Sequence, residues 1–424
     1  MLFYSEARGG STQDRRVRGL DGSDAEFLVV STDEGRALLA EVGAIASPGP
    51  ADITRWRKLA PPEVVAAAIR LAACRRKAGV KFARGDQMWL DPVGLEQATP
   101  EAVAANKAAR FNGAPWIVDL CSGIGGDALA LAANAPVLAV DHDRGMCRRV
   151  AWNAAVYERE DRILPCRASA ERFAIPYGAW VHIDPDRRAS GRGRAVELEG
   201  YAPGPDFLRA LTREATGGAI KLGPASDFAR FVETIDSALE VEIVSLGGEA
   251  KEATVWFGEA VSRLRRATKL PENAVWTDRC GERDWRALAP ISPVAGWIYE
   301  PDPALSRSGL LDSFAKAHGL ARIAADLPYL TADALIETPW LEAFEVQSAH
   351  PLDLKRLRRL IGAERLGPVT VKHKTTKLKP ETIRPLLRSN GDSPTTLFLT
   401  GGAGPGRAIV ARKARNPDGS AATL

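Results

Sequence analysis

The spacing of apolar and polar positions changes along the chain and divides it into regions. Residues 1–24 are rich in Gly, Ser, Arg and Asp and hold few large apolar side chains, which predicts a flexible tail. Residues 25–110 predict a helical domain. Within it, Pro61-Pro62-Glu63 predicts a helix start that Gly79 ends, and Thr99-Pro100-Glu101 predicts a second start with Thr99 as N-cap.

Short apolar runs alternate with helical segments over residues 111–290. The predicted strands are PWIVDL, PVLAVD, ILPCRA, GAWVHIDPD and GGAIKLG. Strands that alternate with helices form parallel βαβ units, so the expected fold class is α/β with a Rossmann-like sheet. VEIVSLGGEAKEATVWFG predicts a hairpin at an edge of that sheet, because two apolar runs meet across a Gly-Gly turn.

Residues 291–424 predict a small α/β domain after a Pro-rich linker at about 291–300. TTLFLT and RAIVARK predict its last strands. Residues 351–424 hold 15 Lys and Arg against 5 Asp and Glu, although the whole chain has a net charge of +4. A basic module on a slightly acidic remainder favours a polyanionic partner such as RNA.

The run VDLCSGIGGD, residues 118–127, places a Gly-rich turn between a strand and a helix. Gly123 and Gly125 permit unusual backbone angles and the close approach of a ligand, and the helix N-terminus offers free N–H groups. Asp141 ends the next predicted strand, where a carboxylate can bind both ribose hydroxyls. The run therefore predicts a site for an adenosine-bearing ligand.

Two ligand classes fit this run. Gly123-x-Gly125-x-x-Ala128 satisfies the dinucleotide fingerprint, and a scaffold that binds nothing is a further alternative. Asp119, expected in the turn itself, would repel a pyrophosphate but attract a methionine ammonium, which favours S-adenosylmethionine. The candidate cofactor-binding residues are Asp119, Cys121, Gly123, Gly125, Asp141, His142 and Ser169.

Asp184, Pro185 and Asp186 follow the fourth predicted strand, at the edge where open α/β sheets bind ligands. Methyl transfer needs a nucleophile aligned near the methyl carbon, and Asp184 could accept a hydrogen bond from a target N–H group. These three residues are the catalytic candidates. Cys166 lies on the third predicted strand, which argues against a cysteine nucleophile.

Basic side chains near this loop and in the terminal module are candidate RNA contacts. The loop arginines could instead pair with Glu197 and Glu199 in a solvated loop, and Lys221 could extend outward along its strand. The candidates are Arg187, Arg188, Arg192, Arg194, Lys221, Lys372, Lys374, Lys377 and Lys379.

Several function classes are not expected. The five cysteines show no Cys/His metal spacing, so we expect free thiols and no bound metal. No run of 18 apolar residues predicts a membrane span, and the N-terminus lacks the order of a secretory signal. We therefore expect a cytoplasmic protein.

Several motifs together resemble the bacterial class I S-adenosylmethionine-dependent methyltransferases that carry a THUMP-like C-terminal domain. They are VDLCSGIGGDALALA, VLAVDHD, HIDPDRRASGRGR, GGAIKLGPASDF, VSLGGEAKEATVWFG, VTVKHKTTKLKPE and TLFLTGGAGPGRAIVAR. The N-terminal KFARGDQMWLDPVGLEQAT and AANKAARF are similar to that family's leading helical region. The resemblance covers nearly all of the chain from about residue 30 onward.

The resemblance implies a cofactor turn at Asp119, Gly123 and Gly125, a ribose-binding acid at Asp141, and a reaction loop at residues 184–188. We expect a methyltransferase that acts on a base nitrogen of tRNA or rRNA. Two alternatives remain open: a methyltransferase for a protein or small molecule, whose basic residues serve solubility, and a non-catalytic RNA-binding scaffold.

Overall fold

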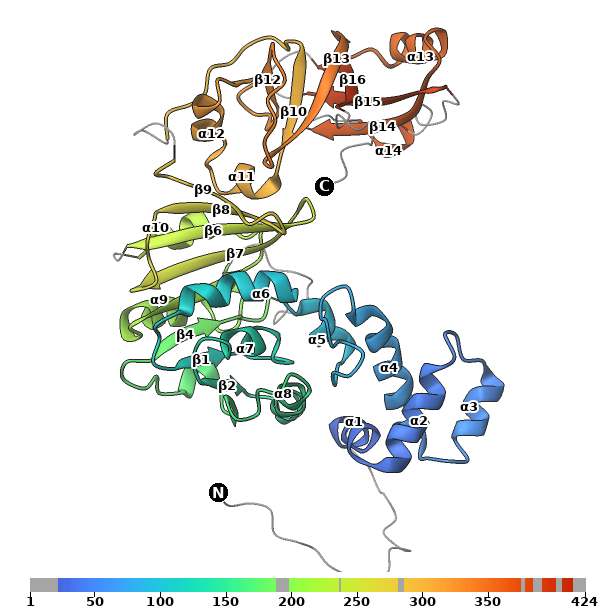
Figure 1. Ribbon diagram of the computed structural model, residues 1–424, viewed down its shortest axis with the longest axis vertical. Coiled ribbons are helices and arrows are strands. Elements are labelled where there is room, and N and C mark those ends of the chain that lie inside the picture. The colour runs from blue at the N-terminus through green and yellow to red at the C-terminus, as the bar shows by residue number, and fades with distance from the viewer. Residues whose placement is uncertain are drawn as a thin grey trace, which may run out of the picture.

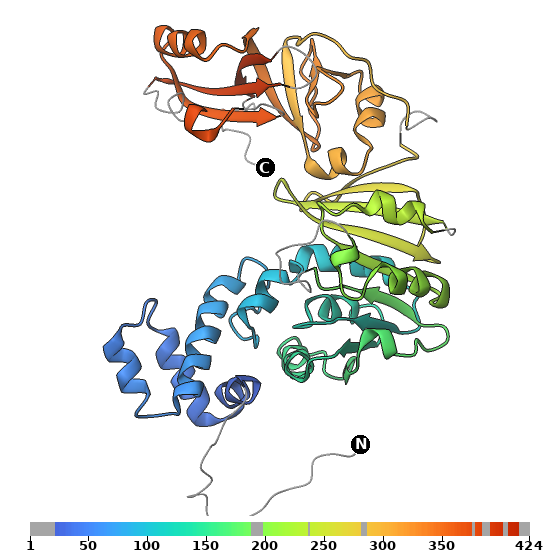
Figure 2. The same ribbon diagram turned by 180° about the vertical axis from the view of Figure 1, so that it is seen from behind.

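The computed structural model describes residues 22–187, 198–235, 238–280, 286–374, 378–383, 391–401 and 406–414. The molecule has three regions: N-terminal helices, a nine-stranded middle sheet and a seven-stranded C-terminal sheet. The C-terminal sheet occupies one end of the long axis, and the N-terminal helices lie beside the parallel part of the middle sheet, toward the other end (Figure 1). The N-terminal helices and the C-terminal sheet project to the same side of the middle sheet in Figure 1 and in the view from behind (Figure 2).

The N-terminal region is helical, as its pattern predicts. Its elements are α1 (Gly22–Ser31), α2 (Asp33–Gly43), α3 (Pro50–Trp56), α4 (Pro62–Ala78), α5 (Pro92–Gln97), α6 (Glu101–Ala108) and a 3-10 turn (Ala109–Phe111). The predicted limits of α4 are confirmed, because Pro61 is its N-cap and Gly79 its C-cap. α1 begins at Gly22, inside the expected tail, and the rest of that tail lies outside the described residues.

The middle sheet has the order β3-β2-β1-β4-β5-β7-β6-β8-β9. Its strands are β1 (Ile117–Leu120), β2 (Val137–Asp141), β3 (Ile163–Arg167), β4 (Trp180–Ile183), β5 (Gly217–Leu222), β6 (Leu239–Leu246), β7 (Glu249–Gly258), β8 (Arg265–Leu270) and β9 (Ala274–Thr277). The helices around it are α7 (Gly126–Leu131), α8 (Arg144–Val156), α9 (Pro205–Glu214) and α10 (Phe228–Glu233), with 3-10 turns at Ala170–Arg172 and Leu198–Gly200. Strands β1 to β5 are parallel, so the expected Rossmann-like class is confirmed.

The predicted hairpin forms between β6 and β7 across Gly247 and Gly248, whose φ angles are 59° and 76°. Its expected place at a sheet edge is wrong. β7 pairs with β5, while β6 pairs with β8 and β8 with β9, so two further strands extend the sheet. The sequence of β8, RRATKL, escapes a search for apolar runs because its polar side chains bind carboxylates buried on β6.

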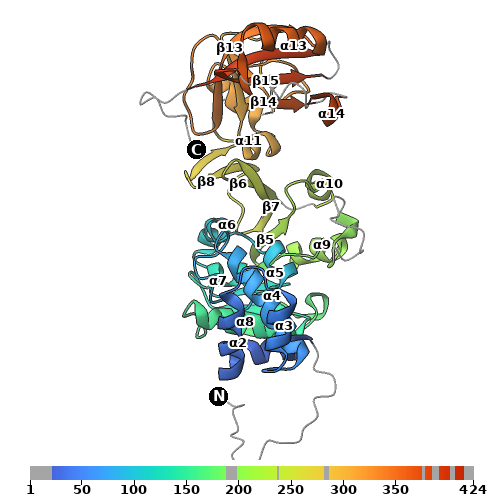
Figure 3. The same cartoon turned by 90° about the vertical axis from the view of Figure 1, so that its right-hand side faces the viewer.

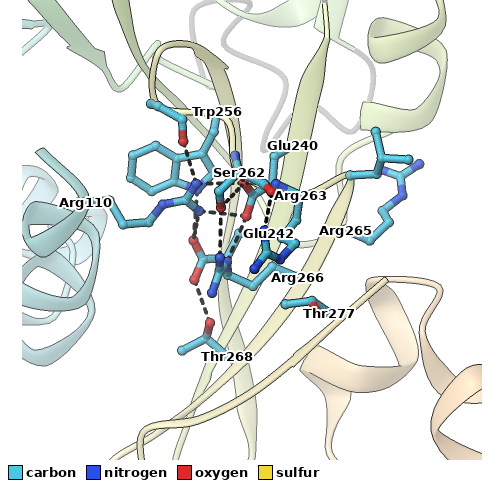
Figure 4. Close-up of polar contacts among 12 residues, drawn as sticks. Arg110, Glu240, Glu242, Trp256, Ser262, Arg263, Arg265, Arg266, Thr268 and Thr277 are labelled. Carbon is cyan, nitrogen blue, oxygen red and sulfur yellow. Dashed lines mark hydrogen bonds and ion pairs between the residues drawn. The ribbon is translucent and has the colours of Figure 1, made fainter. Parts of the chain in front are cut away.

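These carboxylates form a polar cluster between the end of α6 and the sheet (Figure 4). Arg110 donates to Glu240 at 2.8 Å and to Glu242 at 3.0 Å, and lies 3.9 Å from the ring centroid of Trp256. Arg266 donates to Glu240 at 2.8 Å. Burial alone would raise the pKa of Glu240, but the two arginines outweigh it and lower that pKa to about 2. The cluster therefore anchors α6 on β6 and β8.

The C-terminal sheet has the order β11-β12-β10-β13-β16-β15-β14. Its strands are β10 (Trp297–Pro301), β11 (Ala321–Arg322), β12 (Leu330–Ala332), β13 (Leu341–Pro351), β14 (Leu366–Lys374), β15 (Ser393–Thr400) and β16 (Arg407–Lys413), and its helices are α11 (Pro303–Arg307), α12 (Leu311–Ala317), α13 (Leu354–Ala363) and α14 (Pro380–Ile383). Only the β14–β15 pair among these described strands is parallel. β10 occupies part of the expected linker, since its backbone pairs with β12 on one side and with β13 on the other. The domain limits remain predictions.

The two sheets share one apolar core. Tyr299 of β10 and Leu305 of α11 belong to the same buried cluster as Val241 of β6. Arg307 donates to the carbonyl of Pro224 at 2.9 Å, which links α11 to the loop after β5. The C-terminal sheet is therefore packed on the extended part of the middle sheet.

Candidate active site

A cavity of about 580 Å³ opens at the carboxyl ends of β1, β2 and β4. This volume lies within the range of small-molecule sites, and the position is the crevice where open parallel sheets bind ligands. The lining side chains come from the turn after β1, the end of β2, the loops after β3 and β4, and α5. They include Val93, Gly94, Gln97, Thr99, Cys121, Ser122, Gly123, Asp141, His142, Ser169, Asp184, Pro185, Asp186 and Arg187.

The turn after β1 is shaped to hold a ligand against its backbone. Gly123 has a φ of 53°, and a Cβ placed on it would meet no atom within 4 Å, so its position opens to the cavity. Gly125 has a φ of 88° and packs against Val150. The hydroxyl of Ser122 is buried at the cavity wall without a hydrogen-bond partner, so it is available to a polar ligand group.

Asp141 lies at the end of β2 with its carboxylate in the cavity wall. Oδ2 accepts a hydrogen bond from the amide of Gly123 and Oδ1 from that of Asp143, both at 2.9 Å. Burial raises the pKa of Asp141, although the two amides oppose the rise. Each carboxylate oxygen has a second lone pair, so Asp141 can also accept two ribose hydroxyls, which fits an adenosine ligand.

The reaction loop follows β4 on the other side of the cavity. Asp184 is partly exposed, and its Oδ2 lies 2.5 Å from Nζ of Lys221. Pro185 is buried, and Asp186 exchanges backbone hydrogen bonds of 2.8 and 3.0 Å with Ala202. The loop is therefore held in place, with Asp184 presenting a hydrogen-bond acceptor to the cavity.

A curated relative shares most of the chain. An uncharacterized S-adenosylmethionine-dependent methyltransferase of Mycobacterium tuberculosis, present in strains CDC 1551 / Oshkosh and ATCC 25618 / H37Rv, is 31% identical over 342 residues. The match covers 77% of this chain and 90% of the relative. The chain belongs to the S-adenosylmethionine-dependent methyltransferases.

Family models match three parts of this methyltransferase. A THUMP domain-like model matches residues 341–413, a domain of unknown function matches residues 24–78, and a model described as RNA cap guanine-N2 methyltransferase matches residues 114–187. A solved structure from Porphyromonas gingivalis W83, named as a methyltransferase, superposes with a TM-score of 0.70 at 18% identity and covers 89% of this chain and 98% of its own. The expected methyltransferase class with a THUMP-like C-terminal domain is confirmed.

The helix α5 closes one side of the cavity, which the sequence interpretation missed. A Cβ on Gly94 would lie 2.4 Å from Cγ2 of Ile124, so only glycine lets α5 pack on the cofactor turn. Lys81 fixes the other end of α5, because its ammonium binds the carbonyls of Leu95, Glu96 and Ala98 at 2.7 to 2.9 Å. Asp91-Pro92 was the available signal, since an Asp N-cap before Pro marks a helix start.

Replacing Gly94 with alanine is expected to weaken S-adenosylmethionine binding. The added methyl group overlaps Ile124, and overpacking of this kind costs about 1–3 kcal/mol. Isothermal titration calorimetry measures the affinity. The matched control is Gly43→Ala at the end of α2, where no atom lies within 4 Å of the added methyl group. Equal affinities in both variants and the wild type would show that α5 is not tightly packed on the turn.

Lys221 does not line the cavity, so the expected direct contact with RNA is not supported. Its side chain is buried, and Nζ lies 2.5 Å from Asp184 and 3.7 Å from Asp127. Burial lowers the pKa of Lys221, but the two carboxylates outweigh it and the net pKa is raised. The charged ammonium of Lys221 therefore orients the carboxylate of Asp184 from the buried side.

The charges continue from Asp127 into the protein. Nζ of Lys107 lies 2.9 Å from Asp127 and 2.9 Å from Glu252, and the hydroxyl of Thr99 donates to Asp127 at 2.7 Å. Thr99 is thus not an N-cap, since Pro100 precedes the first turn of α6. Burial opposes the charged form of Asp127, yet Lys107 and Lys221 outweigh it and lower its pKa. This series of charges connects the reaction loop to α6 and β7.

Asp119 lies within β1 rather than in the turn, so it does not face the cavity as expected. Its carboxylate is buried and binds Nδ1 of His182 at 2.6 Å. Burial raises the pKa of Asp119, and His182 opposes the rise. The pair joins β1 to β4 beneath the cavity. Cys121, His142 and Ser169 do reach the lining, so their expected roles stay predictions.

The expected RNA contacts divide into several groups. Arg187 lines the cavity. Lys374 and Lys379 are exposed in the C-terminal region. Lys372 instead binds Glu300 and Glu342 within its own domain, because β14 brings it beside two carboxylates. Arg188, Arg192, Arg194 and Lys377 lie outside the described residues.

The described part of the chain offers no group of three His, Cys, Asp or Glu side chains that could hold a metal ion. All five cysteines are free thiols. Over the same residues, none of the helices has the length and apolar character that a membrane crossing requires.

Proposed function

We propose that this S-adenosylmethionine-dependent methyltransferase transfers a methyl group to a nitrogen of an RNA base. The observation that carries the proposal is the match of residues 114–187 to the RNA cap guanine-N2 methyltransferase model, because this segment builds the turn after β1, Asp141 and the Asp184 loop. The THUMP-like domain and the excess of basic residues after position 351 also favour a polyanionic substrate.

The walls of the cavity suit the two ends of the cofactor. The carboxylate of Asp141 would bind the ribose hydroxyls, and the amides at the start of α7 with the hydroxyl of Ser122 would bind the methionine end. The lining segment Ala168–Ala170 would contact the adenine. When bound, S-adenosylmethionine supplies a methyl group on a sulfonium, so the target nitrogen bonds to carbon while the carbon–sulfur bond breaks and its electron pair stays on sulfur.

The reaction loop positions the target. Asp184 accepts a hydrogen bond from an N–H of the base, which orients the nitrogen lone pair toward the methyl group. Lys221 holds this carboxylate in place from the buried side. After transfer the nitrogen releases one proton to solvent, for which strong acid–base catalysis is not required.

The test uses RNA from cells that lack the gene and, as a control, RNA from cells that carry it. Purified protein and tritium-labelled S-adenosylmethionine are added. The RNA is then digested to nucleosides, which are separated, counted for label and identified by mass spectrometry. We expect label in one methylated nucleoside, and only in RNA from the cells without the gene. No label in either RNA, with label in the protein or small-molecule fraction of an extract from the same cells, would reject RNA as the substrate. No label in any of these fractions would reject the proposed methyl transfer.

A further inference from the structure

The exposed face of α13 carries a dense group of cations. Its ten residues, LKRLRRLIGA, contain four basic side chains and no acidic one. Leu357 and Ile361 are buried against the C-terminal sheet, which turns the four basic residues to solvent. We name these the α13 cations: Lys355, Arg356, Arg358 and Arg359, all exposed.

The α13 cations repel one another along the helix. Lys355 lies three and four positions before Arg358 and Arg359, and Arg356 lies three before Arg359, so three like-charge pairs share this face. Each such pair costs about 0.2–0.5 kcal/mol in a helix. None of the four forms an ion pair within the described part of the chain, and the N-cap carboxylate of Asp353 accepts from two backbone amides instead.

Lys372 provides the contrast within the same domain. Its ammonium binds Glu300 and Glu342 and lies 5.0 Å from the ring centroid of Phe344, so its charge is compensated inside the fold. Among the described residues, the α13 cations have no acidic partner within ion-pair distance, and Asp353 acts on Lys355 and Arg359 only at longer range. An external anion would relieve their repulsion, and three of them are arginines, whose planar groups bind phosphate in bidentate geometry.

We propose that the α13 cations bind the phosphate backbone of the RNA substrate away from the base that is methylated. This inference rests on the proposed function and adds the surface that holds the RNA. α13 lies near one end of the molecule, and α5, whose residues line the cavity, lies nearer the other end (Figure 3). The N-terminal helices and the C-terminal sheet project to the same side of the middle sheet, so an RNA with one base in the cavity can continue toward the C-terminal domain (Figure 1).

The test neutralises the α13 cations together in the full chain. The variant is Lys355→Gln, Arg356→Gln, Arg358→Gln and Arg359→Gln. Binding of fluorescein-labelled total tRNA is followed by anisotropy between about 50 and 200 mM salt. We expect weaker binding, and a salt dependence whose slope falls by about 0.7–0.9 for each lost phosphate contact.

A matched variant removes the same charge elsewhere. It carries Arg57→Gln and Lys58→Gln just after α3, and Arg76→Gln and Lys77→Gln on α4, where all four side chains are exposed. Its tRNA binding should stay close to wild type, and both variants should keep wild-type S-adenosylmethionine affinity and thermal melting, which tests the fold.

The outcomes separate this inference from the proposed function. If the wild type methylates RNA but the α13 variant binds tRNA with the same slope, the α13 surface is rejected and the proposed function stands. Equal loss in both variants would also reject it, because net charge alone would then explain binding. If the wild type binds anionic lipid vesicles and no RNA, both proposals fail.

Discussion

Replacing Lys107 with methionine is expected to lower the free energy of unfolding by about 3–5 kcal/mol, because it leaves the buried carboxylates of Asp127 and Glu252 without their nearest cation. Lys107 is 2% exposed and lies 2.9 Å from both Asp127 and Glu252. Lys221 lies 3.7 Å from Asp127, but among the described residues it forms no ion pair with Glu252. Urea unfolding followed by circular dichroism measures the change.

Two further variants serve as controls for Lys107→Met. Lys251→Met removes a more exposed lysine from the same strand as Glu252, and should change stability by no more than about 0.5 kcal/mol. The double variant Lys107→Met with Glu252→Met removes a buried charge of each sign and should recover part of the loss. A Lys107→Met protein as stable as the wild type would mean that the buried charges are compensated without Lys107.

Replacing Asp184 with alanine is expected to lower the rate of methyl transfer by about 100-fold or more, because the target nitrogen loses the acceptor that orients it. S-adenosylmethionine affinity should stay unchanged within error, since Asp141 and the turn after β1 are intact. Lys221 keeps Asp127 as a partner, so the fold should persist. Single-turnover rates with labelled cofactor and RNA from cells lacking the gene measure the effect, and calorimetry measures the affinity.

Asp206→Asn supplies the control for this variant. Asp206 lies on α9 with its side chain 98% exposed, so its removal should leave the transfer rate unchanged. A transfer rate in Asp184→Ala equal to that of the control would exclude Asp184 as a positioning group for the base. A parallel loss of cofactor affinity would instead place Asp184 at the cofactor.

Local patterns in the sequence predict β1, β2, β4 and β5 because these strands are buried and consist mostly of apolar residues. β3 is a partly exposed edge strand and is predicted from its place in the alternation of strands and helices. The β6–β7 hairpin is predicted from its Gly-Gly turn. The turn at Gly123 and the acid at Asp141 follow from the same pattern, since each comes directly after a strand. β8 could not be found in this way. Its arginine and threonine side chains become compatible with a buried strand only when the carboxylates of β6 lie beside them.

The missed parts of the site depend on contacts between distant residues. Lys107 and Glu252 are 145 positions apart, and Thr99 and Asp127 are 28 apart, so no helical or strand spacing connects them. Asp119 was misplaced for a simpler reason: the strand extends one residue beyond it, and its alternation turns the side chain toward His182. A motif locates the backbone of a site, but the direction of each side chain depends on where the strand ends.

Because α5 packs on the cofactor turn, the cavity lies at the interface between the N-terminal helices and the middle sheet. A ligand that fills the cavity contacts both regions, so it stabilises their association. At a free ligand concentration of about 100 Kd this linkage amounts to about 2.7 kcal/mol. Bound S-adenosylmethionine would thus stabilise the contact between the N-terminal helices and the sheet. The product that remains after methyl transfer would stabilise the same contact in proportion to its own affinity. The stability of this contact would therefore depend on which of the two ligands is bound.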